Sequence, residues 1–425
     1  MGAKRSLVSV DLTHLGEPLD LGPLTTQLAT FGHKLEEKQK ALPSLEVPFL
    51  LRETDFKRMV TVADELRANS DVLIVAASGG CALAARAMLE AFQPVMGWQI
   101  PRLIFLGDHL STDVLEEFAA TVGRAKLSAI VCSYGDPSIE LAVTQRVIAD
   151  VIRRRHGLAE SQRRIVLVSG EDSRALHELA KLEGHRHLKL PLRAKGQYLA
   201  LTAATLLPLA TIGVDPTAVL EGARSLARSM DKQPIEDNDC FQFAAAREVL
   251  WGDGKCECLT LPDPRLHWLG EWWRYVCGPS SQALAPHAAF ANSWTTHQRL
   301  YLNGPAPEGV DRHQFEVSVE FAQMSEEPEL GGPDSNYDGL ADCKGSKIRT
   351  LEESYRRVLA ERCVRAKHPL IRLELPRMDA FSIGSLMCFF ETVAAVNQRL
   401  AEIPGWDDLK QAVSAEQILD QVSKT

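Results

Sequence analysis

Short apolar runs alternate with longer segments whose apolar residues recur at helical spacing in the first half of the chain. The apolar runs cover residues 71–78, 102–108, 128–133 and 163–170, and each ends at serine, aspartate or glycine. Strands that are apolar on both faces are typical of a parallel sheet covered by helices on both sides. The pattern therefore predicts an α/β domain with a parallel sheet.

A second alternating region follows. Strands are expected at residues 255–261, 314–321 and 370–376, with a tryptophan-rich helix at 268–276 and a long helix at 382–403. Thr350 is expected to begin a further helix, with Glu353 placed for a capping box. We predict two three-layer αβα sandwich domains with parallel sheets, and helical arms at the N- and C-termini.

The expected boundaries are an N-terminal arm over residues 1–55, a first α/β domain over 56–215, a second over 216–400 and a helical tail over 401–425. Residues 197–214 are uncharged and nearly long enough to cross a bilayer. Because Pro208 and several threonines interrupt this segment, we interpret it as a buried core helix that links the domains, and expect no membrane partner.

Composition is ordinary for a soluble globular protein, with 45% hydrophobic and 24% charged residues. The net charge of -9 and the lack of a long basic run argue against a nucleic-acid partner. The N-terminus lacks the apolar core of a signal peptide, and nine scattered cysteines do not form a disulfide framework. A cytoplasmic location is expected.

Two patterns superficially suggest metal sites. Cys256 and Cys258 form a pair without a second pair at zinc spacing, so they are interpreted as strand residues. Residues 334–339 match the start of a calcium loop, but its twelfth position is Gly345 rather than glutamate. The loop is interpreted as a solvated turn, and no metal or other cofactor is expected.

Two strand-to-helix junctions are candidate ligand loops. The first is Ser78, Gly79, Gly80 and Cys81, and the second is the segment 132–140 with Ser133 and Ser138. Glycines allow a ligand to approach the backbone, helix N-termini attract anions, and serine hydroxyls can bind a phosphate. A tight turn explains the first junction nearly as well, and Asp136 in the second would repel a phosphate.

Residues 194–215, AKGQYLALTAATLLPLATIGVD, resemble a segment of glucose-6-phosphate isomerases. In that family a Gly-Gly-Arg turn opens a long apolar helix that ends in Leu-Leu-Pro and a Gly-hydrophobic-Asp step. Further similar segments are SGGCALAARA, FLGDHLSTD, CSYGDPSIE, TTHQRLYLNGP and MDAFSIGSLMCFFETVAAV. This ordered series covers roughly residues 60–412.

The resemblance implies the sugar isomerase (SIS) fold, which is two flavodoxin-like sandwiches. It also implies a phosphorylated sugar as ligand and a homodimer. The family reaction moves a proton between adjacent sugar carbons, which requires a glutamate base, an arginine near the oxyanion, and a histidine and a lysine for ring opening.

The chain departs from the family at each of these positions. Gln197 replaces the arginine, Thr295 stands where the histidine is expected, and either Tyr275 or Gly278 takes the place of the glutamate. The lysine has no counterpart, although Lys410 lies close by in the sequence. We predict a glucose-6-phosphate isomerase-like protein on a phosphosugar-binding scaffold, with lost or strongly altered activity.

Two alternatives stay open. The chain could be an active aldose–ketose isomerase that uses substitute residues, for which His297, Arg193 and Lys410 are the candidates. It could also be a non-enzymatic structural or regulatory protein.

Overall fold

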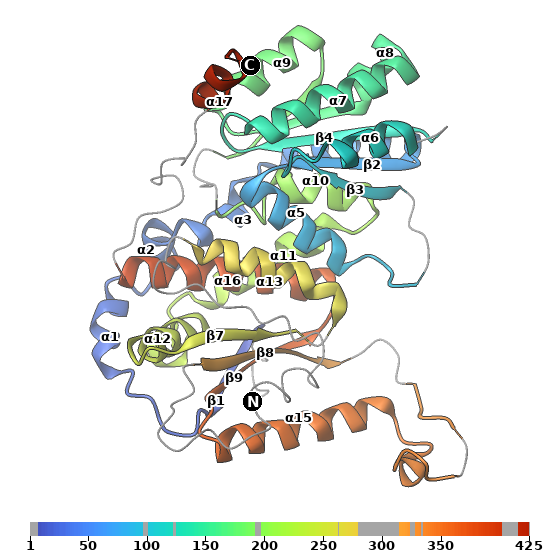
Figure 1. Cartoon of the computed structure of the whole chain (residues 1–425). Coiled ribbons are helices and arrows are strands. Elements are labelled where there is room, and N and C mark those ends of the chain that lie inside the picture. The colour runs from blue at the N-terminus through green and yellow to red at the C-terminus, as the bar shows by residue number, and fades with distance from the viewer. Residues whose placement is uncertain are drawn as a thin grey trace.

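Figure 1 shows the computed structural model, in which two β-sheets lie one above the other with a layer of helices between them. The structure describes residues 7–96, 101–121, 125–191, 197–261, 263–278, 314–323, 328–332, 335–401 and 415–424. Further helices cover the outer face of each sheet.

The first sheet is parallel, and its strand order among the described residues is β3-β2-β4-β5-β6. The strands are β2 (Val72–Ala77), β3 (Arg102–Leu106), β4 (Leu127–Ser133), β5 (Ile165–Ser169) and β6 (Arg186–Lys189). All residues of β2, β4 and β5 are buried, which explains their apolar composition. This confirms the α/β class and the parallel arrangement.

Helices cover both faces of the first sheet (Figure 1). On the outer face lie α6 (Thr112–Thr121), α7 (Ile139–His156), α8 (Leu158–Arg164) and α9 (Arg174–Glu183). On the inner face lie α4 (Glu53–Asn69), α5 (Gly79–Ala91) and α10 (Ala203–Thr211).

The second sheet has the order β1-β9-β8-β7. Its strands are β1 (Ser9–His14), β7 (Cys256–Thr260), β8 (Gln314–Gln323) and β9 (Leu370–Arg377). Strands β7, β8 and β9 are parallel, whereas β1 runs antiparallel to β9. The N-terminal arm is therefore not only helical, since it supplies one edge strand of the second sheet.

The inner face of the second sheet packs against helices, and α15 covers its outer face (Figure 1). The helices of this half are α11 (Pro216–Ser229), α12 (Asp239–Gly252), α13 (His267–Val276), α15 (Ile348–Arg365) and α16 (Ala380–Leu400). The remaining elements are α1 (Gly22–Ala29), α2 (Leu35–Ala41), η1 (Pro43–Leu45), α3 (Val47–Leu50), η2 (Ile235–Asp237), η3 (Pro264–Leu266), η6 (Ala341–Cys343) and α17 (Ala415–Val422).

One hydrophobic core joins the two halves. It contains Val75 of the first sheet, Val317 of the second and Leu386 of α16, all of which are buried. Trp272 and Trp273 are fully buried in the same core, so the tryptophan cluster is largely a packing feature. The two halves therefore stabilise one another through a continuous apolar interior.

Two helices begin at other residues than the sequence suggested. Helix α10 begins at Ala203 rather than at 197, and the Thr202 hydroxyl accepts a hydrogen bond from its first turn, 3.3 Å from the Ala204 nitrogen. Helix α15 begins at Ile348 with Lys347 as its N-cap, so Thr350 lies inside the helix and the predicted capping box does not form. Glu353 forms an ion pair with Arg349 instead.

Helix α16 is, among the described residues, long and apolar enough to cross a membrane, and 89% of its apolar window is buried inside the protein. All residues of α10 are buried as well, in agreement with its interpretation as a core helix. All nine cysteines lie in the described part of the chain, and none of them forms a disulfide bond there.

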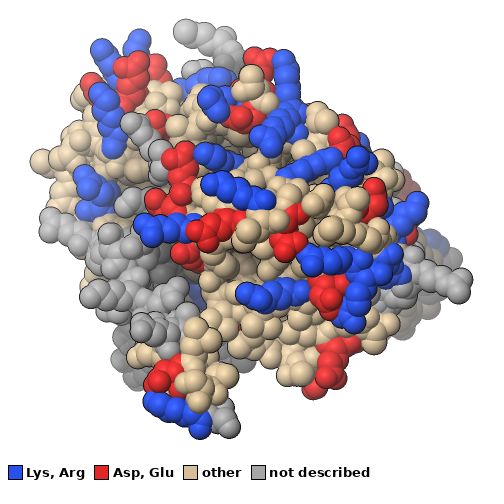
Figure 2. All heavy atoms as spheres, turned by 90° about the horizontal axis from the view of Figure 1, so that it is seen from above, with Lys and Arg blue, Asp and Glu red and all other residues tan. Residues whose placement is uncertain are grey.

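Basic and acidic side chains alternate over the face that α7, α8 and α9 build, as Figure 2 shows. Arg153 pairs with Glu183, and Arg154 pairs with Asp150 on the same helix. Such exposed pairs contribute little to stability, but they keep the charge of this face mixed.

Candidate functional site

The two predicted ligand loops leave the first sheet side by side. Strands β2 and β4 are neighbours, with Ala77 in register with Cys132, so Ser78 and Ser133 follow at the same edge of the sheet. The chain order changes direction between these two strands, because β3 lies on one side of β2 and β4 on the other. Ligands of open α/β sheets bind at such a switch point, outside the carboxyl ends of the strands.

Two helix N-termini open at this edge. Helix α5 begins at Gly79, whose φ of 54° lies in the left-handed region, and the Ser78 hydroxyl makes no capping bond to the helix. Helix α7 begins after Ser138, whose hydroxyl accepts a weak hydrogen bond from the Leu141 nitrogen at 3.3 Å. Both helices thus present backbone N–H groups and a partial positive charge to the crevice.

The sequence suggested that the charge of Asp136 would repel an anion at this edge of the sheet, but the structure shows its carboxylate bonded to a neighbouring helix. Its Oδ1 accepts hydrogen bonds from the Ala175 nitrogen at 3.0 Å and from the Ser173 hydroxyl at 3.5 Å. The carboxylate therefore caps α9 on the neighbouring strand connection, where negative charge stabilises the helix.

Two buried thiols lie beside these loops, Cys81 on α5 and Cys132 on β4. Cys81 and Cys132 are both buried, and a hydrogen bond between them, together with burial, raises the pKa of the Cys132 thiol well above its ordinary value. A buried thiol of raised pKa is chemically inert. Cys81 can therefore contribute its backbone N–H to a ligand, whereas its thiol packs into the interior.

Tyr275 reaches the crevice from the second half of the protein. It lies on α13, and a Cβ atom placed on Gly79 would meet its hydroxyl oxygen at 3.5 Å. The sequence offered this residue as one place for the family's glutamate. The structure puts a phenol, which is no base at neutral pH, beside the Gly79 turn.

Gln197 is held by α16. Its side chain is only 3% exposed, and its Nε2 donates to Oε1 of Gln398 at 2.8 Å. The Tyr198 hydroxyl donates to the same oxygen at 3.1 Å. The position that carries an arginine in the resembled family therefore carries a neutral amide fixed to a neighbouring helix.

A buried carboxyl group lies on the same face of α16. The Glu391 side chain is 0% exposed, its Oε1 accepts a hydrogen bond from the Ala200 nitrogen at 3.1 Å, and its Oε2 has no partner among the described residues. Burial raises its pKa from 4.5 to about 8, and the Ala200 N–H opposes the shift. Sequence reasoning missed this residue, although one glutamate inside the apolar run SLMCFFETVAAV was a signal.

The other predicted catalytic positions lie outside the described residues. These are Thr295, His297 and Lys410, together with the substitute candidate Arg193. Their roles stay predictions.

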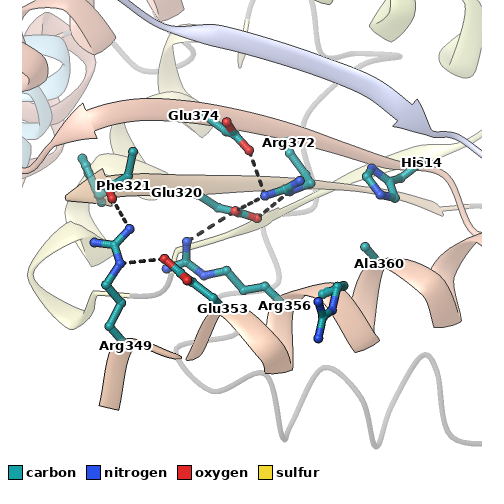
Figure 3. Close-up of a pocket in the computed structure, with 11 residues that line it drawn as sticks. His14, Glu320, Phe321, Arg349, Glu353, Arg356, Ala360, Arg372 and Glu374 are labelled. Carbon is teal, nitrogen blue, oxygen red and sulfur yellow. Dashed lines mark hydrogen bonds and ion pairs between the residues drawn. The ribbon is translucent and has the colours of Figure 1, made fainter. Parts of the chain in front are cut away.

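A separate cavity of about 370 Å³ lies between α15 and strands β8 and β9 (Figure 3). Its guanidinium groups are largely paired: Arg372 binds Glu320 at 2.7 Å, Arg349 binds Glu353 at 2.6 Å, and Arg356 also approaches Glu320 at 3.3 Å. We interpret the lining of this cavity as an ion-pair network that covers the polar face of β8, because the arginine side chains are already paired with carboxylates.

The described residues hold no group of three or more histidine, cysteine, aspartate or glutamate side chains fit for a metal ion. In the loop that resembles a calcium site, Asn336 and Asp338 accept backbone N–H groups of Ala341 and Leu340, as turn residues do. Cys258 is buried and Cys256 half-buried on β7.

No family model matches the chain. It is 27% identical over 375 residues to the glucose-6-phosphate isomerase of Listeria monocytogenes, covering 86% of this chain and 83% of that protein. It is 26% identical over 371 residues to the enzyme of the same name from Shouchella clausii, covering 85% and 82%. The chain is a homologue of the glucose-6-phosphate isomerases.

Solved structures agree on the fold. A hypothetical protein from Thermus thermophilus superimposes with a TM-score of 0.78 at 19% identity, covering 98% of this chain and 100% of that one. The glucose-6-phosphate isomerase of Chlamydia trachomatis superimposes with a TM-score of 0.69 at 15% identity, covering 88% and 74%. The protein has the isomerase scaffold, with altered residues at the positions discussed above.

Proposed function

We propose that this glucose-6-phosphate isomerase homologue binds a phosphorylated sugar at the edge of β2 and β4, and that it isomerises the sugar very slowly or not at all. The phosphate group would bind the backbone N–H groups at the starts of α5 and α7, with the hydroxyls of Ser78, Ser133 and Ser138. The register of β2 with β4 supports this assignment, since it brings both loops to the switch point.

The observation that supports the proposed loss of activity is the state of Gln197. Its amide is buried, bonded to Gln398 and uncharged, so it does not supply the positive charge that an arginine would give to an oxyanion. Losing oxyanion stabilisation costs about 10²–10³-fold in rate. Losing a general base costs a further factor of about 10²–10⁴.

The test is a pair of measurements on the purified protein. Calorimetry with glucose 6-phosphate and fructose 6-phosphate should show saturable binding that free glucose does not reproduce. A coupled assay should show isomerisation slower than that of an ordinary isomerase by about four orders of magnitude or more. Absence of binding would refute the site, and rapid turnover would refute the loss of activity.

An active isomerase with substitute residues is the competing function. It would use a cation and a base from residues outside the described ones, with His297, Arg193 and Lys410 as the candidates. Turnover that each of the changes His297→Ala, Arg193→Ala and Lys410→Ala abolishes would establish it. A protein that neither turns over nor binds phosphosugars would instead favour a purely structural or regulatory role.

The same relationship leads us to propose a homodimer in the cytoplasm. The two relatives named above are bacterial proteins that carry the name glucose-6-phosphate isomerase. Light scattering coupled to size exclusion should give twice the chain mass of 46.9 kDa.

A further inference from the structure

Two side chains of α16 hold the segment that precedes α10. Glu391 accepts the Ala200 N–H, and Gln398 accepts bonds from Gln197 and Tyr198. The two residues are seven positions apart on a helix, so they lie on the same face. Residues 197–202 are not helical, so these side-chain bonds and the packing of the segment keep its shape.

We propose that Glu391 is a positioning residue of the phosphosugar site, which fixes residues 197–202 while it is protonated and releases them when it ionises. The inference rests on the proposed function, since the family resemblance puts position 197 beside the sugar. Glu391 touches no ligand and acts through Ala200.

The geometry makes the neutral form the stable one. The carboxyl group is fully buried, and one N–H group is its hydrogen-bond partner among the described residues. An ionised carboxylate in such surroundings loses far more hydration than one hydrogen bond restores. Ionisation therefore favours conformations in which the segment moves and water reaches the carboxylate.

The described groups that surround Glu391 supply no positive charge that would stabilise its ionised form. Cys388 lies one turn earlier on α16, and burial, followed by the charge of Glu391, raises the pKa of its thiol. From the facing segment come the Ala200 N–H and, further along, the neutral side chains of Gln197 and Tyr198. Among the described groups, burial and the Ala200 N–H are the influences that set the pKa of Glu391.

The first test is the pH profile of glucose 6-phosphate binding between pH 7 and 9, where the phosphate stays a dianion. With a carboxyl group that titrates near pH 8, the binding-competent fraction at pH 9 is about one tenth, so the dissociation constant should rise about tenfold. Glu391→Gln keeps the shape without a titratable proton, and its profile should be flat.

Glu248→Gln is the matched control. Glu248 is a half-buried carboxyl group of raised pKa, and it accepts a hydrogen bond from Asn397 rather than from residues 197–202. This variant should keep the wild-type profile. Parallel profiles for the wild type and Glu391→Gln would overturn the inference while leaving the proposed function intact.

A second measurement needs no ligand. Amide hydrogen exchange of residues 198–202, corrected for the intrinsic effect of pH, should accelerate between pH 7 and 9 in the wild type and not in Glu391→Gln. If neither protein binds a phosphosugar at pH 7, the proposed function fails, and exchange alone decides the role of Glu391. Equal exchange in both proteins would refute that role.

Discussion

Breaking the buried ion pair between Arg247 and Glu257 should strongly destabilise the second half of the protein. The Arg247 Nε lies 2.7 Å from Oε2 of Glu257, and both side chains are 0% exposed. Arg247 also donates to Asn397, and Trp273 donates to the second oxygen of Glu257 at 2.8 Å. The pair therefore joins α12, β7, α13 and α16, and Arg247→Met would leave Glu257 as an uncompensated buried charge.

The magnitude follows from two independent estimates. Unit charges about 4 Å apart attract by about 4 kcal/mol at an effective dielectric constant of about 20. Removing one partner of a buried pair costs about 3–5 kcal/mol in proteins. The double variant Arg247→Met with Glu257→Leu should recover most of this loss, because an apolar replacement leaves no buried charge.

Urea unfolding followed by tryptophan fluorescence measures these differences. Arg265→Met is the control, since Arg265 forms a similar pair with Asp263 at 2.6 Å but is 37% exposed, and it should cost below about 1 kcal/mol. Equal destabilisation in the single and double variants would refute the reasoning.

Three further outcomes are expected. Gly79→Ala should abolish glucose 6-phosphate binding measured by calorimetry. Gly157→Ala is its control, because Gly157 also has a positive φ but its Cβ would meet open space. The control should lose a similar amount of folding stability and keep the affinity for glucose 6-phosphate. Gln197→Arg should lower the melting temperature, because it places a cation in a site that is 3% exposed, and should not restore turnover in the coupled assay. Glu391→Gln should become more stable relative to the wild type as pH rises. The pKa of Glu391 in the folded protein is about 8, above the ordinary 4.5, so the neutral carboxyl group contributes its full stabilisation below pH 4.5. This stabilisation of the wild type is lost between pH 4.5 and about pH 8, by about 1.4 kcal/mol per pH unit. Urea unfolding at pH 5 and pH 9 checks this, and equal pH dependence in the two proteins would contradict it.

The sequence was most informative where strands are buried on both faces. The runs at 71–78 and 128–133 match β2 and β4 closely, because a central strand must be apolar throughout. The strands β6 and β1 were not recognised. Both are edge strands with polar residues, and the burial that produces an apolar pattern is incomplete there.

The candidate site was predictable in its loops but not in its contacts. Glycine and serine after buried strands pointed to residues 78–81 and 133–138. Asp136 caps α9 by accepting a hydrogen bond from Ala175, which lies 39 positions further along the chain. Gln197 bonds to Gln398, which is 201 positions away. Local patterns carry no information on such pairs, so the sequence indicated Asp136 as a repelling charge and gave no contact for Glu391.

The two parts of the proposed site have different origins, which is why we expect binding to persist in a protein that has lost catalysis. The proposed phosphate site is built from strand register and helix N-termini, which depend on the backbone and tolerate many side chains. Proton transfer depends on individual side chains of defined charge. A change such as arginine to Gln197 removes chemistry locally, while the amide pair with Gln398 keeps α16 packed against the segment. A chain that has lost several such groups can therefore retain its fold, and we expect it to retain the proposed anion site as well.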